Sequence, residues 1–132
     1  MIFDVGSGEC VATVGEDEGP GKLAEPYGVA FNSRGELYVS DSGRHRILVY
    51  DRGGAYLRGF GSLGSENGQF DCPAGLAFTG EGELVVADSG NHRVQVLSVE
   101  GVPVRSFGSK GTGDGEFINP KTVAVGAGGA IL

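Results

Sequence analysis

Short runs of alternating apolar and polar residues, separated by turns, dominate the chain. Four such runs cover residues 27–31, 36–40, 46–50 and 55–60, and four more cover residues 74–78, 83–87, 93–98 and 103–107. A period of two with many β-branched residues is typical of short strands. The segments between the runs are rich in Ser, Asp and Gly, which suit a reversal of the chain direction. No segment has a helical period, so the pattern predicts an all-β protein.

The runs belong to an internal repeat of 47 residues. Residues 26–72 begin PYGVAFNSRGELYVSDSGRHRILVYD, and residues 73–119 begin PAGLAFTGEGELVVADSGNHRVQVLS, in an alignment without gaps. Residues 1–25 align with the last two strands of a preceding repeat, and residues 120–132 align with the start of a third. Four antiparallel strands in a repeat of this length form one blade of a β-propeller. We therefore expect a β-propeller segment with two full repeats, two partial ones and about three blades' worth of strands.

The repeated motifs resemble a known family. Residues 41–47 read DSGRHRI and residues 88–94 read DSGNHRV, and each motif is flanked by Pro-x-Gly-hydrophobic-Ala-Phe and Phe-Gly-Ser. This combination resembles NHL repeats, which typically build six-bladed propellers. The resemblance covers nearly the whole chain and implies a recognition scaffold, often the substrate-binding or RNA-binding part of tripartite-motif ubiquitin ligases. The sequence contains no RING or B-box clusters of cysteine and histidine, so ligase activity would not reside in it.

The strand count bears on the assembly. Residues 1–25 are expected to supply the two outer strands of one blade, and residues 26–119 two complete blades. Residues 120–132 would supply the two inner strands of a further blade, which makes twelve strands. One hypothesis is a head-to-tail homodimer, in which the inner pair of one chain joins the outer pair of the other and closes a six-bladed ring without free sheet edges. The other interpretation is a fragment of a larger protein or a monomeric partial propeller. Both are compatible with the strand count.

Composition and charge narrow the class of partner. The 26 glycines among 132 residues follow no Gly-X-Y period and accompany 39% apolar residues, which excludes collagen and simple disorder. The net charge of −7 opposes general attraction to nucleic-acid phosphates or anionic membranes. The sequence contains no bilayer-spanning apolar run and no signal peptide, so we expect a soluble, cytoplasmic protein. Cys10 and Cys72 have neither metal-site spacing nor a disulfide framework around them, and reduced thiols are expected.

In each blade, the turn between the second and third strands lies on the same rim of the propeller as the links between repeats, because strand direction alternates. We look for binding residues on this rim. Loops on a rigid scaffold are where binding residues concentrate. The candidates for a protein or peptide partner on this rim are Tyr27, Arg44, His45, Asn91, His92 and Lys121. Four further residues, Asp41, Arg46, Asp88 and Arg93, are interpreted as structural because they recur in both repeats. We expect each carboxylate to accept hydrogen bonds in its turn and each arginine to pair with a carboxylate or carbonyl.

No catalytic residue, cofactor or metal site is predicted. His45 and His92 belong to neighbouring blades and are expected to lie too far apart to share a zinc ion. A lyase of the peptide-amidating type, whose propeller resembles this repeat, is therefore only a second alternative. The first alternative is a single-stranded RNA-binding module, which acidic residues in the links disfavour. The favoured function is a non-catalytic scaffold that binds a protein or peptide, as in the substrate-recognition part of a larger ubiquitin ligase.

Overall fold

The structure is a computed structural model that describes residues 2–4, 10–13, 19 and 21–108. A two-stranded antiparallel sheet contains β1 (Ile2–Asp4) and β2 (Cys10–Thr13). Two four-stranded sheets follow, and their strands are β3 (Pro26–Phe31), β4 (Leu37–Asp41), β5 (Arg46–Tyr50) and β6 (Tyr56–Phe60), then β7 (Pro73–Phe78), β8 (Leu84–Asp88), β9 (Arg93–Leu97) and β10 (Pro103–Phe107). The expected all-β class is confirmed. The partial repeat expected at 120–132 lies outside the described residues.

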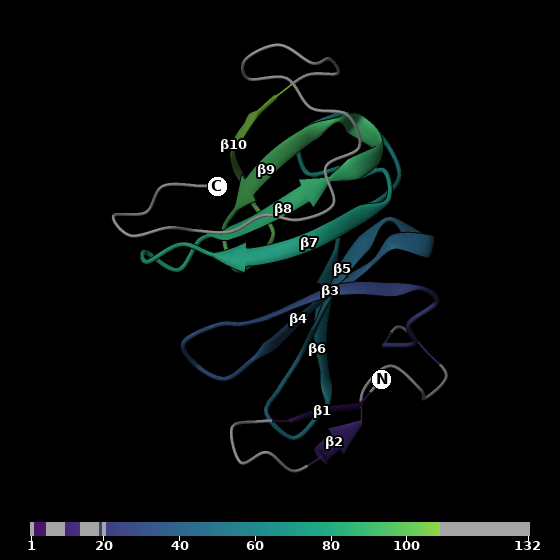
Figure 1. Ribbon diagram of the computed structural model, residues 1–132, viewed down its shortest axis with the longest axis vertical. Coiled ribbons are helices and arrows are strands. Elements are labelled where there is room, and N and C mark those ends of the chain that lie inside the picture. Colours follow the sequence, from purple (N-terminus) through teal and green to yellow (C-terminus); the bar gives the residue numbers. More distant parts are fainter. Residues whose placement is uncertain (1, 5–9, 14–18, 20, 109–132) are drawn as a thin grey trace.

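Each four-stranded sheet is a propeller blade in which every strand pairs antiparallel with its neighbour in sequence. We call β3–β6 blade 1 and β7–β10 blade 2. Figure 1 shows the two blades stacked one above the other, with β3 and β7 in contact at their junction. The only helices among the described residues are the one-turn 3₁₀ segments η1 (Ser42–Arg44) and η2 (Ser89–Asn91), and neither is long enough to cross a membrane.

The main apolar core lies between the two blades. Because each sheet has two apolar faces, the blades bury them by stacking. The buried side chains that form this core are Tyr38, Ile47, Val49, Phe70, Leu76, Leu84, Val86 and Leu97. The Tyr38 ring meets the Phe78 ring edge-on, with centroids 4.9 Å apart. Tyr38 also donates a hydrogen bond to the carbonyl oxygen of Val99 at 3.1 Å, so apolar packing and polar contacts both join the blades.

The innermost strands approach each other closely at Gly28. The hydroxyl of Ser40 accepts a hydrogen bond from the Gly28 N–H at 2.7 Å and donates one to the carbonyl oxygen of Ala74 at 2.6 Å. A Cβ atom at Gly28 would overlap that same carbonyl oxygen. Glycine is therefore required here by the backbone of the next blade.

β3 and β7, the first strands of the two blades, differ in how much of one side of the strand is covered. Leu76 on β7 is 8% exposed because blade 1 packs over it, whereas Val29, at the equivalent position of β3, is 46% exposed. Tyr27 and Phe31, on the same side of β3 as Val29, are also exposed.

Deeper in blade 1, Tyr50 is buried and donates to the carbonyl oxygen of Gly21 at 2.7 Å. Burial raises the pKa of Tyr50 from the usual 10.0 to about 12.

Candidate functional site

The blade junction has two ends, which lie on opposite rims. We call the edge that carries η1, η2 and the link of residues 61–72 the link rim. The other edge carries the turns of residues 32–35 and 79–82, and we call it the hairpin rim. The sequence-based candidates belong to the link rim.

A buried carboxylate organises the link rim of blade 2. Asp88 is 0% exposed, and its Oδ1 accepts a hydrogen bond from the Asp71 N–H at 2.8 Å. Its Oδ2 accepts three more, from Asn91 Nδ2 at 3.0 Å, Arg93 Nε at 2.8 Å and Gln95 Nε2 at 3.1 Å. The ion pair with Arg93 offsets the cost of burying the charge. Asp88 thus fixes both the turn and the link that enters the blade.

The equivalent carboxylate in blade 1 has fewer partners. Asp41 is also 0% exposed and accepts hydrogen bonds from the N–H groups of Ala24 at 3.1 Å and Glu25 at 2.9 Å. Arg46 Nε lies 3.7 Å from Asp41 Oδ2, and Arg46 Nη2 donates to the carbonyl oxygen of Lys22 at 2.8 Å. Each carboxylate was expected to accept hydrogen bonds mainly within its own turn, but neither carboxylate caps its 3₁₀ segment. Both instead satisfy N–H groups of the link, which have no strand partner.

The candidate binding residues of the link rim differ in how accessible they are. Tyr27 is 56% exposed, and the exposed Arg44 donates to the carbonyl oxygen of Lys22 at 3.3 Å. His45 and His92 are half-buried. Asn91 is also half-buried, and its amide donates to Gly64 as well as to Asp88, so it serves the architecture of the rim. Lys121 lies outside the described residues.

Two residues that sequence reasoning did not select lie beside His45. The Cys72 N–H donates to His45 Nδ1 at 3.0 Å, and Asp71 Oδ1 lies 3.8 Å from the same nitrogen. His45 and Cys72 are 27 residues apart in sequence, so no local motif connects them. Only a difference between the repeats marks these two positions in the sequence: Asp71 and Cys72 stand where the first link has Ala24 and Glu25.

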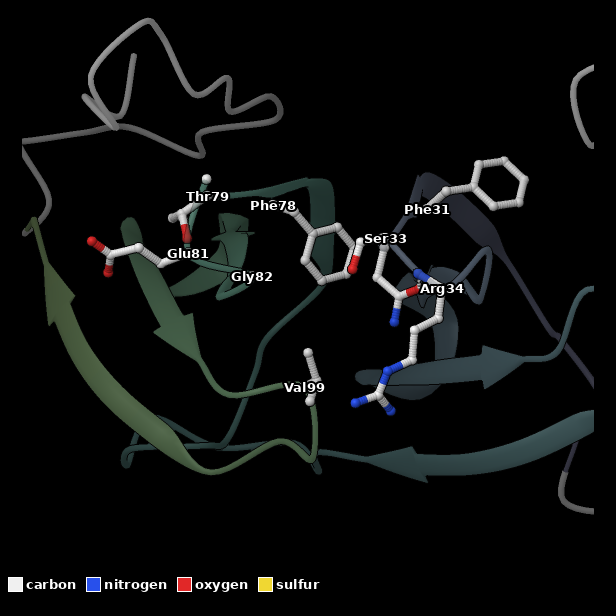
Figure 2. Close-up of a pocket in the computed structure, with 10 residues that line it drawn as sticks. Phe31, Ser33, Arg34, Phe78, Thr79, Glu81, Gly82 and Val99 are labelled. Atoms are coloured by element: carbon white, nitrogen blue, oxygen red, sulfur yellow. Dashed lines mark hydrogen bonds between the residues drawn. The ribbon is translucent and has the colours of Figure 1, made fainter.

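The hairpin rim contains a cavity of about 410 Å³ between the blades. Its walls come from both turns and from the turn after β9, and are formed by Phe31, Asn32, Ser33, Arg34, Phe78, Thr79, Gly80, Glu81, Gly82 and Val99. Figure 2 shows the Phe78 ring near the middle, Val99 below it, and Arg34 and Glu81 on opposite sides, while the Phe31 ring points away. The cavity therefore has an apolar centre and charges of opposite sign at its two ends. None of these residues was predicted from the sequence as a binding residue.

Comparisons with known proteins support the motif-based resemblance. A model of the NHL repeat matches residues 23–50 and 70–97. The chain is 37% identical over 49 residues to protein brain tumor of Drosophila melanogaster and 40% identical over 51 residues to RING finger protein nhl-1 of Caenorhabditis elegans. Each alignment covers somewhat more than a third of this chain, at 37% and 39%, but only 5% of the relative.

Solved structures share the propeller architecture. A catalytically inactive virginiamycin B lyase from Staphylococcus aureus with quinupristin superposes with a TM-score of 0.64, at 18% identity over 86% of this chain and 36% of that one. A luciferin-regenerating enzyme superposes with a TM-score of 0.56, at 21% identity over 81% of this chain and 35% of that one. At such identities the likeness concerns the fold alone, and this chain spans about a third of each structure. The two segments that match the NHL repeat, residues 23–50 and 70–97, each lie largely within one blade.

Proposed function

We propose that the chain is a non-catalytic NHL scaffold that binds a peptide segment of a protein partner in the cavity on its hairpin rim. The observation that carries this proposal is the lining of the cavity, in which Phe78 and Val99 lie between Arg34 and Glu81. Binding sites commonly combine apolar walls with a few polar groups that orient the ligand. This cavity, with its volume of about 410 Å³, offers both.

The chemistry of the lining indicates which peptide would fit. An apolar side chain would pack on Phe78 and Val99, and a neighbouring carboxylate would pair with the Arg34 guanidinium. Arg34 is exposed, and it takes part in no ion pair within the described part of the chain. Glu81 would favour a basic group at the other end. These contacts favour a peptide of mixed charge over a polyanion such as RNA, which Glu81 and the net charge of −7 would repel.

A role in ubiquitin transfer is the finer form of this proposal. The Caenorhabditis elegans relative is named a RING finger protein, and a scaffold of this kind beside a RING domain would select the substrate. The chain covers only 5% of that relative. The peptide-binding function does not depend on this larger context.

The cavity predicts a rim-specific response to charge reversal. A phage-displayed library of random linear peptides, selected on the immobilised chain, should be enriched in peptides with a carboxylate next to an aromatic or aliphatic residue. Arg34→Glu should weaken binding of a selected peptide by about 10-fold to 100-fold, because a charge-assisted hydrogen bond contributes about 1.5–3 kcal/mol. Arg44→Glu makes the same charge change on the link rim and should leave the affinity unchanged. Isothermal titration calorimetry measures both.

Two outcomes would contradict the proposal. If Arg44→Glu weakened binding and Arg34→Glu did not, the partner would bind the link rim that the sequence indicates. If single-stranded RNA bound more tightly than any selected peptide, with an affinity that fell steeply with salt, the RNA-binding alternative would hold.

The exposed face of β3 suggests a second proposal, which concerns assembly. We propose that a second copy of the chain covers Tyr27, Val29 and Phe31, as blade 1 covers the equivalent side of β7. β1 and β2 form a two-stranded sheet, and residues 120–132 of the other copy, which align in sequence with the start of a repeat, would complete it as a blade beside β3. This arrangement is the head-to-tail dimer expected from the strand count.

Light scattering coupled to size-exclusion chromatography tests the dimer. The unmodified chain should have the mass of two chains, and Val29→Asp should have the mass of one, because a charge would be buried in the interface. Val104→Asp is a matched control on the outer strand β10, where Val104 is 51% exposed, and should remain dimeric. A single-chain mass for the folded, unmodified protein would contradict the proposal.

A further inference from the structure

We propose that His45, Asp71 and Cys72 form a zinc site on the link rim, at the junction of the two blades. One ligand atom from each side chain lies within 4.8 Å of the other two. His45 Nδ1 is 3.8 Å from Asp71 Oδ1, whereas two ligand atoms on a tetrahedral zinc ion are about 3.4 Å apart for bonds of about 2.0–2.1 Å. Small movements of these side chains, together with release of the Cys72 N–H from His45 Nδ1, would therefore bring the three ligand atoms to bonding distance.

The acid and the thiol are not required by the blade architecture. One repeat earlier the equivalent link positions hold Ala24 and Glu25, and one repeat later they hold isoleucine and asparagine, at positions 118–119. The histidine recurs as His92, so a blade needs the histidine but not its two neighbours in space. Features that repeat belong to the architecture of a repeat protein, and a set that occurs at one junction calls for another explanation.

The backbone at Cys72 also differs from that of the first link. Cys72 has φ of 51°, in the left-handed region that non-glycine residues rarely adopt. Glu25, at the equivalent position of the first link, does not have a positive φ, so the link can be built without this conformation. Strained backbone of this kind is found preferentially at functional sites. Here it brings the N–H of Cys72 to His45 Nδ1 at 3.0 Å, and so holds the cysteine against the imidazole.

Asp71 is held in place from two sides. Its N–H donates to the buried Asp88 at 2.8 Å, and its carbonyl oxygen accepts from the Gly90 N–H at 2.7 Å. A Cβ atom at Gly90 would overlap the Asp71 carboxylate, so glycine leaves the space that this carboxylate occupies. These contacts fix the backbone of Asp71 at the junction and leave its carboxylate beside His45.

The donor set of nitrogen, oxygen and sulfur suits Zn²⁺. Because His45 Nδ1 accepts a hydrogen bond, the neutral ring carries its proton on Nε2, and the Nδ1 lone pair is directed into the junction. A zinc ion would replace the Cys72 N–H at this lone pair. The Cys72 thiol would bind as thiolate and release its proton to solvent. With three protein ligands, water or a group from a partner completes the tetrahedron on the exposed side, where Cys72 lies.

The consequence would be a metal bridge between blade 1 and the link that leads into blade 2. His45 follows η1 in blade 1, whereas Asp71 and Cys72 immediately precede β7. Zinc would therefore tie the two blades together at the link rim. This site is independent of the cavity on the hairpin rim.

Zinc binding to the 132-residue chain tests the proposal, with a chromophoric chelator as competitor. We expect one zinc ion per chain and a loss of affinity of at least about 100-fold in Cys72→Ser and in His45→Asn, since even the loss of an outer-shell partner costs about 10-fold to 100-fold. Asparagine tolerates the left-handed backbone of His45. The matched controls are Cys10→Ser and His92→Asn, which remove the other thiol and the equivalent histidine and should bind zinc as the unmodified chain does.

Cobalt substitution provides a readout that does not depend on how well a variant folds. The unmodified chain with Co²⁺ should show a thiolate-to-cobalt charge-transfer band in the ultraviolet and the visible bands of a tetrahedral ion. Absence of the charge-transfer band would overturn the proposal, as would zinc affinity that is retained in Cys72→Ser or lost equally in Cys10→Ser and His92→Asn.

Discussion

Replacing Asp88 with alanine is expected to lower the free energy of unfolding by about 3–5 kcal/mol, the cost of removing one partner from a buried ion pair. The carboxylate is 0% exposed and accepts four hydrogen bonds, so its loss leaves the Asp71 N–H without this acceptor and the Arg93 guanidinium without its carboxylate partner, although Arg93, Asn91 and Gln95 keep hydrogen bonds to carbonyl oxygens of the link. Single domains are stable by only about 5–15 kcal/mol, so this one change consumes a large part of the total. Urea unfolding followed by circular dichroism measures the loss.

Two matched variants show whether the loss of stability in Asp88→Ala depends on the number of hydrogen bonds that Asp88 accepts. Asp41→Ala removes the equivalent carboxylate, which accepts two backbone hydrogen bonds and has its arginine 3.7 Å away, so a smaller loss is expected. Asp51→Ala removes an acid that accepts hydrogen bonds from Gly53 and Ala55 in a partly exposed turn, and should cost about 1 kcal/mol. Equal losses in all three variants would contradict the view that Asp88 organises the link rim.

Replacing Gly28 with alanine is expected to force the two blades apart at their inner strands. The added Cβ would overlap the carbonyl oxygen of Ala74, which is backbone and cannot move aside as a flexible side chain would. Overpacking of this kind costs about 1–3 kcal/mol. The loosened junction should also expose the interblade core, which an increase in binding of a hydrophobic dye would detect.

Gly80→Ala is the control for this second prediction. Nothing lies within 4 Å of a Cβ at Gly80, and this glycine does not have a positive φ, so the change should alter stability by no more than about 0.5 kcal/mol. If Gly28→Ala were as stable as Gly80→Ala, the close approach of β3 and β7 would not be needed for blade packing.

The regular elements were the most predictable part of this protein. All eight strands of the two blades lie where the period-two pattern places them, with ends that differ by at most one residue, as at β4, which ends at Asp41. The repeat and its motifs predicted the NHL family, which the matches at residues 23–50 and 70–97 confirm. These predictions succeed because strand pairing within a blade connects neighbours in sequence, so local alternation and turn residues carry the information.

The candidate sites were less predictable than the strands, because they depend on contacts between residues of different repeats. The link rim was selected from strand direction alone, but the position of Cys72 against His45 depends on how a left-handed backbone directs a link between blades. The cavity on the hairpin rim depends on the spacing between two turns that are 47 residues apart, and on which side chains leave the gap unfilled. Neither quantity is encoded in a local pattern.

The sequence by itself determined the all-β class, the four-stranded unit and the resemblance to NHL repeats, because each follows from patterns contained in one repeat. Only the tertiary structure decided which residues of different repeats meet, since identical blade positions acquire different neighbours at the junction. Val29 and Leu76 illustrate this, because they are equivalent in the repeat but 46% and 8% exposed. Packing between blades therefore sets the cavity, the exposed face of β3 and the cluster of His45, Asp71 and Cys72.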